Sequence, residues 1–167
     1  MRAGLLDCPR FVTCRAALRI PNVFSGPYLD RAAHLRKDDA FIAAALRDSA
    51  ALIVPVWKSR SLVRRSAEGC CAEFVTATHE FRRDLADSEL VMLGRFRGHV
   101  CFAAELAGDP PAGLPPGSDF EDLRVAGALL SPDEAGVLAY ARAMILWRQR
   151  HRYCGACGTP TEREGHE

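Results

Sequence analysis

Apolar residues through the middle of the chain follow the pattern of β-strands. The run 52–57 is apolar and rich in β-branched residues. Pro55 lacks the amide donor that a ladder needs, so this run is predicted to be an edge strand or a bulged one. Residues 61–64 are predicted to pair with it, and residues 72–76 form a further predicted strand. The pattern therefore indicates a sheet of short strands.

The clearest β element is a hairpin that joins 90–96 to 99–106. Both arms are apolar enough to pack against helices, and Arg97-Gly98 supplies the turn. Residues 107–118 follow, with four prolines and three glycines, and are predicted to form a loop between the sheet and the rest of the chain.

Helical spacing appears on both sides of these strands. Asp38 is placed to cap a helix of about ten residues, and Thr78 is placed to cap a short charged helix that runs to Leu85. The first of these helices presents one apolar face: Phe41, Ile42, Ala45 and Leu46.

Two more helices are predicted after the loop, each opened by a capping box. Ser118 and Glu121 have the spacing of one box, and Ser131 and Glu134 have that of the other, with Pro132 at the favoured first position. The second helix carries an apolar stripe and ends in basic residues: Val137, Leu138, Ala141, Ile145, then Arg148, Arg150 and Arg152. The expected fold class is α+β, a small mostly antiparallel sheet followed by a helical pair.

Composition narrows the classes of protein to which this fold could belong. The 167 residues are 49% hydrophobic and 26% charged, with a net charge of +1, which is typical of one ordinary globular core. This charge does not favour direct nucleic-acid binding. No apolar run approaches the roughly 18 residues of a membrane span, and no secretory leader is evident. We therefore expect a cytoplasmic protein that does not contact a membrane.

The strongest chemical signal is the knuckle formed by Cys154, Gly155, Ala156 and Cys157, followed by Gly158. A Cys-x-x-Cys turn delivers two thiolates to a tetrahedral zinc ion. A second pair is normally found about 15 to 20 residues further on, but no cysteine follows Cys157. Cys154 and Cys157 are therefore predicted to be structural zinc ligands in half a site, and the chain is expected to be an N-terminal piece of a longer protein.

Other interpretations of the thiols stay open. Cys154 and Cys157 also suit a redox dithiol, although such motifs usually begin a helix, where the dipole lowers the thiol pKa. Vicinal Cys70 and Cys71 are a second redox candidate. His151 and His166 lie near the knuckle. However, His151 is best explained as a solvated helix end, and His166 is poorly spaced for a ligand.

Several segments resemble one known family when read in order. The segments are Leu29-Asp30-Arg31, His34-Leu35-Arg36, Phe120-Glu121-Asp122-Leu123-Arg124, 138–143, Trp147 and 151–158, with Thr161 and 165–167 after them. They are similar to the region before the catalytic domain of NADH pyrophosphatases, the zinc-containing Nudix NAD(+) diphosphatases. The resemblance covers about residues 22–167.

The resemblance implies a division of the chain: an N-terminal extension (1–21), a catalytically degenerate Nudix-like domain (22–130), a connecting helix (131–152) and a truncated half zinc ribbon (153–167). It also implies a homodimer. The complete enzyme would split NAD(H) into NMN(H) and AMP, or remove NAD caps from RNA, with Mg²⁺ or Mn²⁺ held by a Nudix box.

This sequence departs from the family pattern at the catalytic residues. Its one Arg-Glu pair, Arg163-Glu164, is not followed by the Glu-Glu of a Nudix box. No catalytic residue is therefore assigned, and Mg²⁺ or Mn²⁺ is not expected to bind this chain. The expected role is scaffolding and dimerisation, with a Nudix catalytic domain supplied in cis or in trans.

Two alternatives are kept beside this interpretation. Two chains could pool Cys154 and Cys157 into one four-thiolate zinc site, which would make the chain a stand-alone zinc-binding dimerisation module. The chain could instead be a thiol enzyme, which requires a cysteine with a lowered pKa.

Overall fold

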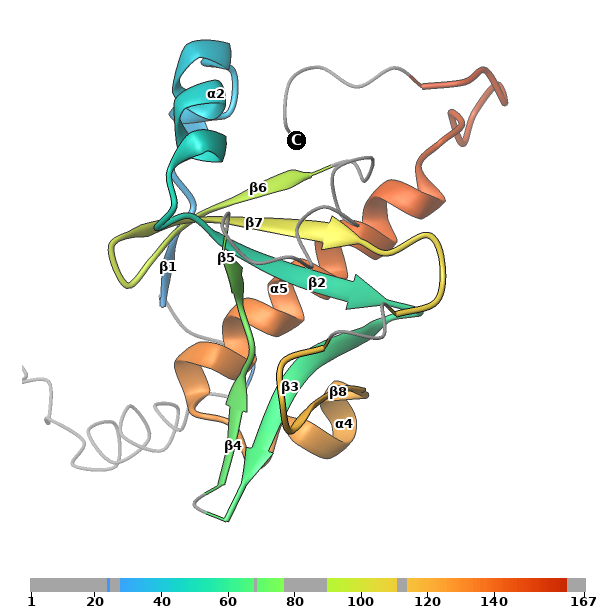
Figure 1. The fold of residues 1–167 in the computed structure, drawn as a ribbon. Helices are drawn as coiled ribbons and strands as arrows, with labels where there is room; N and C mark the ends of the chain where they lie inside the picture. The colour runs from blue at the N-terminus through green and yellow to red at the C-terminus, as the bar shows by residue number, and fades with distance from the viewer. Residues whose placement is uncertain (1–23, 25–27, 68, 77–89, 111–113, 162–167) are drawn as a thin grey trace, which may run out of the picture.

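The computed structural model describes residues 24, 28–67, 69–76, 90–110 and 114–161 (Figure 1). The strands are β1 (Leu29–Asp30), β2 (Leu52–Trp57), β3 (Arg60–Ser66), β4 (Gly69–Ala72), β5 (Val75–Thr76), β6 (Val91–Phe96), β7 (His99–Glu105) and β8 (Ser118–Glu121). The helices are the 3₁₀ turn η1 (Ala33–Leu35), α2 (Asp39–Arg47), α4 (Leu123–Ala126) and α5 (Pro132–Arg150). The predicted α+β class is confirmed. The predicted helix after Thr78 lies outside the described residues.

One mixed sheet organises the molecule. Its strand order is β1-β6-β7-β2-β3-β4, with β5 also paired to β2 and β8 also paired to β3. Among the described strands only β2 and β7 pair in parallel, and the other pairs are antiparallel. The sheet is therefore mostly antiparallel, as the sequence predicts.

The prediction that Pro55 places β2 at an edge of the sheet is wrong. β2 lies between β7 and β3, and Pro55 pairs with Ala104 of β7. On the other side of β2, β5 pairs with Leu52 and Ile53, and β3 pairs with Val56 and Trp57. Position 55 falls between these two ladders, so the missing amide donor interrupts neither of them.

Two tight hairpins set the register of the sheet. Lys58 and Ser59 join β2 to β3 with φ angles of +47° and +62°, and Arg97 and Gly98 join β6 to β7 with φ angles of +49° and +87°. Positive φ at both central residues defines the turn whose twist matches that of paired strands. The predicted hairpins at 52–64 and 90–106 are confirmed.

Gly94 allows a close approach of two backbones. The register between β6 and β7 shifts between Met92 and Gly94, which marks a bulge. A Cβ at Gly94 would lie 2.0 Å from the Asp30 carbonyl oxygen in β1, and the φ angle there is +137°. β1 can therefore pair with β6 only because residue 94 has no side chain.

The helix starts differ from the predicted ones at two places. Asp38 caps α2 as expected, because its carboxylate accepts from the Phe41 amide at 2.9 Å. Residues 118–121, predicted as a capping box, are instead the strand β8, which pairs with 61–64 of β3. This pairing buries Phe120 opposite Leu62, so the short helix α4 begins only after Asp122, which caps it.

The predicted capping box of α5 is also not formed. Pro132 occupies the first turn as expected, but the Ser131 side chain makes no capping hydrogen bond. The Glu134 side chain is buried and turned toward the sheet. Because its carboxylate contacts other elements, it does not return to the Ser131 amide as a capping box requires.

Side chains alternate between two cores on opposite faces of the sheet. Val54 and Val56 pack in a cluster with α4 and α5, whereas Ile53 packs in a second cluster with residues of α2. The same alternation separates Cys101 and Ala103 from Phe102. Figure 1 shows α5 crossing one face of the sheet and α2 standing at its other side. None of the described helices is long and apolar enough to cross a membrane.

Candidate zinc-binding turn at the end of α5

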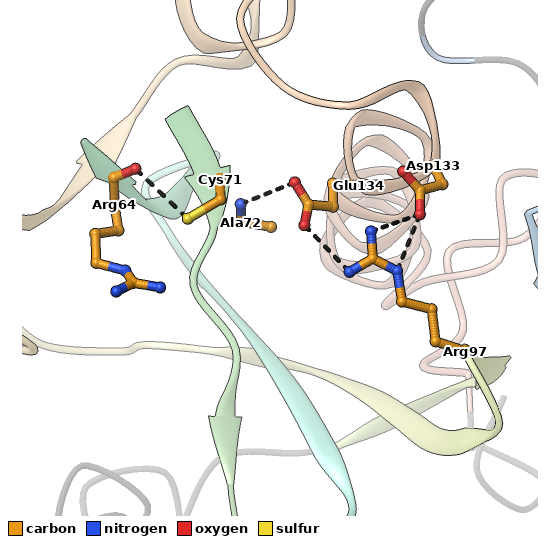
Figure 2. A network of polar contacts seen from close by, with 6 residues as sticks. All are labelled: Arg64, Cys71, Ala72, Arg97, Asp133 and Glu134. Atoms are coloured by element: carbon orange, nitrogen blue, oxygen red, sulfur yellow. Dashed lines mark hydrogen bonds and ion pairs between the residues drawn. The ribbon is translucent and has the colours of Figure 1, made fainter. Parts of the chain in front are cut away.

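A charged network fixes the start of α5 to the sheet (Figure 2). Arg97, in the turn between β6 and β7, donates to Asp133 Oδ2 from Nη2 at 2.6 Å and from Nε at 3.0 Å. Its Nη1 lies 3.4 Å from Glu134 Oε1. Glu134 Oε2 in turn accepts from the Ala72 amide of β4 at 3.4 Å. Two carboxylates of α5 therefore bind two separate parts of the sheet.

The apolar stripe predicted for α5 is confirmed. Val137, Leu138, Ala141 and Ile145 are all buried against the sheet. Trp147, on the neighbouring stripe, is half exposed. The first turn of α5 is ion-paired to the sheet and its inner stripe is buried. The helix therefore holds the residues that follow it at a defined place. Figure 1 shows these residues, in red, extending beyond the end of the helix.

Both cysteines of the knuckle lie in a small hydrogen-bonded turn. The Cys154 amide donates to the Thr159 carbonyl at 2.8 Å, and the Gly158 amide donates to the Cys154 carbonyl at 2.8 Å. Tyr153 and Pro160 form an isolated bridge that closes the turn. Gly158 has a φ angle of +73°, which a residue without a side chain adopts at little cost.

The two thiols are free and accessible. Cys154 is partly exposed, and Cys157 is exposed. The Cys157 sulfur lies 3.2 Å from the Thr159 hydroxyl. Hydrogen bonds from Thr159, first from its side chain and then from its backbone, lower the pKa of Cys157, and the Cys154 thiol lowers it further. An exposed thiol with a lowered pKa suits metal ligation.

The turn fits half of a zinc site. Zinc takes four ligands in a tetrahedron, and thiolates are among its preferred donors. Within the described ranges, no group of three or more His, Cys, Asp or Glu residues comes together. Cys154 and Cys157 would therefore supply two of the four ligands. Zinc binding by this pair stays a prediction.

The His151 ring contacts Trp147 at the end of α5. Its Nδ1 lies 2.7 Å from the Trp147 carbonyl oxygen, and its ring stacks on the Trp147 ring with centroids 4.7 Å apart. These contacts agree with its interpretation as a helix end. His166 lies outside the described residues.

The geometry around Cys70 and Cys71 does not favour a dithiol. They are consecutive residues of β4, so their side chains point to opposite faces. Burial is the largest influence on Cys70 and raises its pKa. Cys101 is buried in β7, where burial raises its pKa to about 12. A raised pKa leaves less thiolate, the form that thiol chemistry uses.

Several carboxylates of the described residues are engaged by a separate partner each. Glu121 pairs with Arg65, and Glu105 accepts from the Gln149 side chain. Asp109 lies 3.7 Å from Lys58. A site that binds Mg²⁺ against a pyrophosphate needs several convergent carboxylates, and such a group is not present in this part of the chain.

Sequence reasoning missed two buried charged residues, Glu134 and Arg36. Glu134 follows a serine by three residues, which is the spacing of a capping box. Arg36 lies in a segment whose only sequence signal is the family resemblance. The partners of both come from segments far away in the sequence, so local pattern carries no signal of their burial.

Comparison with known proteins gives consistent matches. Residues 50–147 match the family described as the NADH pyrophosphatase-like rudimentary NUDIX domain. The NAD-capped RNA hydrolase NudC of Stutzerimonas stutzeri (strain A1501) is 40% identical over 68 residues, which are 41% of this chain and 24% of that protein. The protein of the same description from Deinococcus radiodurans is 33% identical over 76 residues, 46% of this chain and 26% of that protein. The chain thus matches about a quarter of each relative.

Proposed function

This chain belongs to the family of NADH pyrophosphatase-like rudimentary NUDIX domains, and from that premise we propose that it is the N-terminal, non-catalytic portion of an NAD(H) diphosphatase. The observation that carries the proposal is the match over residues 50–147, which include β2 to β8, α4 and most of α5. Both similar relatives are described as NAD-capped RNA hydrolases, which supports the same reaction class.

The proposed role of this chain is to support a catalytic domain rather than to perform chemistry. The 167 residues contain no Nudix box, and the described carboxylates do not converge on a metal site. The Mg²⁺ or Mn²⁺ of the reaction would then be held by a Nudix domain in cis or in trans. The intact enzyme would convert NAD(H) to NMN(H) and AMP, or release an NAD cap from RNA.

Apolar side chains on the helical side support a scaffold and dimerisation role. Four large apolar side chains are exposed on the helical segments: Val125 in α4, Leu129 after it, Trp147 in α5 and Tyr153 after it. Large exposed apolar side chains can be covered by contact with another protein surface. We propose that the catalytic domain and the second subunit of a dimer cover these residues.

The test has two parts. The purified chain is assayed with NADH and NAD-capped RNA in Mg²⁺ and in Mn²⁺, and we expect no turnover. The chain is then co-expressed with the Nudix domain of the Stutzerimonas stutzeri relative, and we expect the two to co-purify. Leu129→Asp should abolish co-purification, because it places a charge in an apolar interface.

Arg47→Asp in α2 is the matched control, because it introduces the same carboxylate at an exposed position on the other side of the sheet. Co-purification should survive this change. Steady hydrolysis that co-purifies with the chain alone would refute the non-catalytic assignment. Co-purification that tolerates Leu129→Asp would refute the proposed surface.

A second candidate function rests on the knuckle. Each chain offers two accessible thiols on a turn beyond the end of α5, and zinc needs four ligands. Two chains that share one zinc ion would form a stand-alone dimerisation module. A complete structural site contributes on the order of 10 kcal/mol, which is ample to hold a dimer.

Native mass spectrometry in zinc tests this alternative. It predicts one zinc ion per two chains, with both zinc and dimer lost on Cys154→Ser. Cys71→Ser, in β4, is the control that should leave both unchanged. A monomer that carries no zinc would exclude the shared site while leaving the NAD(H) diphosphatase proposal intact.

A further inference from the structure

Arg36 is a buried cation with neutral partners. Arg36 is the residue that directly follows η1 in the chain, and it is 8% exposed. Nη2 lies 3.1 Å from the Tyr140 hydroxyl and 3.4 Å from the Leu93 carbonyl oxygen, and no described residue accepts a hydrogen bond from Nε. No carboxylate pairs with Arg36 in the described part of the chain. Burial of a charge without an opposite charge beside it is unfavourable. An anion bound nearby would therefore stabilise this guanidinium.

The Tyr140 hydroxyl is the side-chain hydrogen-bond partner of Arg36. A guanidinium has donors and no acceptor, so the Tyr140 hydroxyl must accept from Arg36 and keep its own proton for another partner. None of the described residues accepts that proton. A hydroxyl that accepts from a cation is a stronger donor, so Tyr140 is prepared to donate to an anion.

A second guanidinium lies on the same tyrosine. Arg31 is exposed, and its Cζ lies 4.9 Å from the centre of the Tyr140 ring. Arg31 and Arg36 are held by a bent segment in which Ala32 has a φ angle of +42° and its amide donates to Asp30 Oδ1 at 3.0 Å. The bend brings two positive charges to one phenol group.

A hollow of about 430 Å³ opens at this place. Tyr28, Arg31 and Tyr140 line it together with small residues of α5, including Gly136 and Ala139. A Cβ at Gly136 would lie 3.2 Å from Tyr28 Cδ2, so the glycine lets the Tyr28 ring lie close to the helix. The hollow therefore combines an apolar, aromatic wall with a cationic edge, and its size is within the range of small-molecule sites.

We propose that this hollow binds a small phosphate monoester with an organic body. The Arg31 guanidinium and the Tyr140 hydroxyl bind the phosphate oxygens, and the body packs on Tyr28 and the small residues of α5. Arg36 is a positioning residue, which compensates the dianion from behind Tyr140. A phosphate monoester fits better than a carboxylate because two cations stand near one site and the dianion balances both. This inference does not depend on the proposed function.

Isothermal titration of the full chain with AMP, adenosine and inorganic phosphate tests the proposal. AMP should bind more tightly than inorganic phosphate, because phosphate has no body to pack on Tyr28. Adenosine, which has no charge, should bind at least tenfold more weakly than AMP. Tyr140→Phe and Arg31→Gln should each weaken AMP binding about tenfold, the usual loss for one hydrogen bond to a charged group.

Arg60→Gln is the matched control. Arg60 is also exposed beside an aromatic ring, with its Cζ 6.0 Å from the Trp57 ring centre, but it lies away from the hollow. It should leave AMP affinity unchanged. Thermal unfolding of each variant shows whether it is folded. Wild-type chain that binds AMP no better than adenosine, or Tyr140→Phe that binds AMP as wild type does, would overturn the proposal.

The positioning role of Arg36 has its own readout. The second ionisation of a phosphate monoester has a pKa of about 6, so wild-type chain should bind AMP more tightly at pH 7.5 than at pH 5. Arg36→Lys keeps the charge and should retain this preference, whereas folded Arg36→Met should lose it. If Arg36→Met fails to fold, Arg36→Gln takes its place and should lose the preference in the same way. A preference that persists in a folded variant without the charge would refute the role.

Discussion

Gly94 shows how far one residue controls the approach of two strands. The carbonyl oxygen of Asp30 occupies the place of its missing Cβ, and its φ angle is positive. Gly98, four residues later, also has a positive φ angle, but open space surrounds it. Substitutions at the two glycines can therefore distinguish the effect of a steric clash from that of backbone strain.

We expect Gly94→Ala to lower the free energy of unfolding by about 3 kcal/mol or more, because the methyl group would force β1 away from β6. Gly98→Ala, which adds strain without a clash, should cost about 1–2 kcal/mol. Urea denaturation of both variants measures the difference. Equal losses would show that β1 moves aside without cost.

At the same scale, sequence reasoning succeeded where a residue acts on its own neighbours. Asp38 caps the helix that it precedes, and Cys154 and Cys157 lie in one turn as their spacing predicts. It failed for Arg36 and Glu134, because their burial depends on Tyr140 and Ala72, which are more than 60 residues away from them in the chain.

At the scale of elements, the segment 118–121 illustrates how a tertiary contact overrides a local signal. Ser118 and Glu121 have the spacing of a capping box, yet β3 offers an unpaired edge and the segment joins it as β8. The Glu121 carboxylate then binds Arg65 of β3 through two hydrogen bonds of 2.5 and 2.6 Å. This ion pair ties β8 to the sheet.

Glu121→Gln should lower the free energy of unfolding by about 0.5–1 kcal/mol at pH 7, the range for a partly exposed pair. Asp109→Asn is the control, because Asp109 is almost fully exposed in its pair with Lys58, and it should have no measurable effect. Denaturant titrations compare the two variants. An effect of Asp109→Asn as large as that of Glu121→Gln would assign the loss to net charge instead.

The same pair has a pH dependence of known sign. The hydrogen bond from Arg65 is the largest influence on Glu121 and lowers its pKa below the ordinary 4.5. A carboxyl whose pKa is lower in the folded state stabilises the fold above its unfolded pKa and loses that effect as the pH falls through the folded value. The stability difference between wild type and Glu121→Gln should therefore be full at pH 6, begin to shrink below pH 4.5, and be lost only as the pH falls through the lowered pKa of the folded state. A difference that grows on acidification would contradict the pairing.

At the scale of the whole molecule, the knuckle and the hydrophobic cores are separate. One core cluster joins the sheet to α4 and α5, the other joins it to α2, and neither includes a residue after Ile145 among its buried members. The turn at 153–160 is held by its own backbone hydrogen bonds. Zinc would then organise this turn without supporting the domain.

Removal of metal should therefore leave the main unfolding transition in place. We expect a chelator to shift the thermal midpoint by less than about 2 °C, while it speeds amide exchange at Cys154 and Gly158, because local opening does not require global unfolding. Apo and zinc-treated protein are compared by calorimetry and hydrogen exchange. A shared zinc dimer would instead make the midpoint depend on protein concentration, and so the experiment distinguishes the two candidate functions.

The sequence by itself determined the α+β class, the two hairpins, the stripe of α5 and the cysteine turn. Each of these depends on periodicity, on capping or on short spacing, which act between near neighbours. Only the tertiary structure decided that Pro55 lies inside the sheet, that 118–121 is a strand, and that Arg31 and Arg36 meet at Tyr140. These outcomes depend on which distant segments come together, and burial and strand pairing across the fold outweigh local preference at those positions.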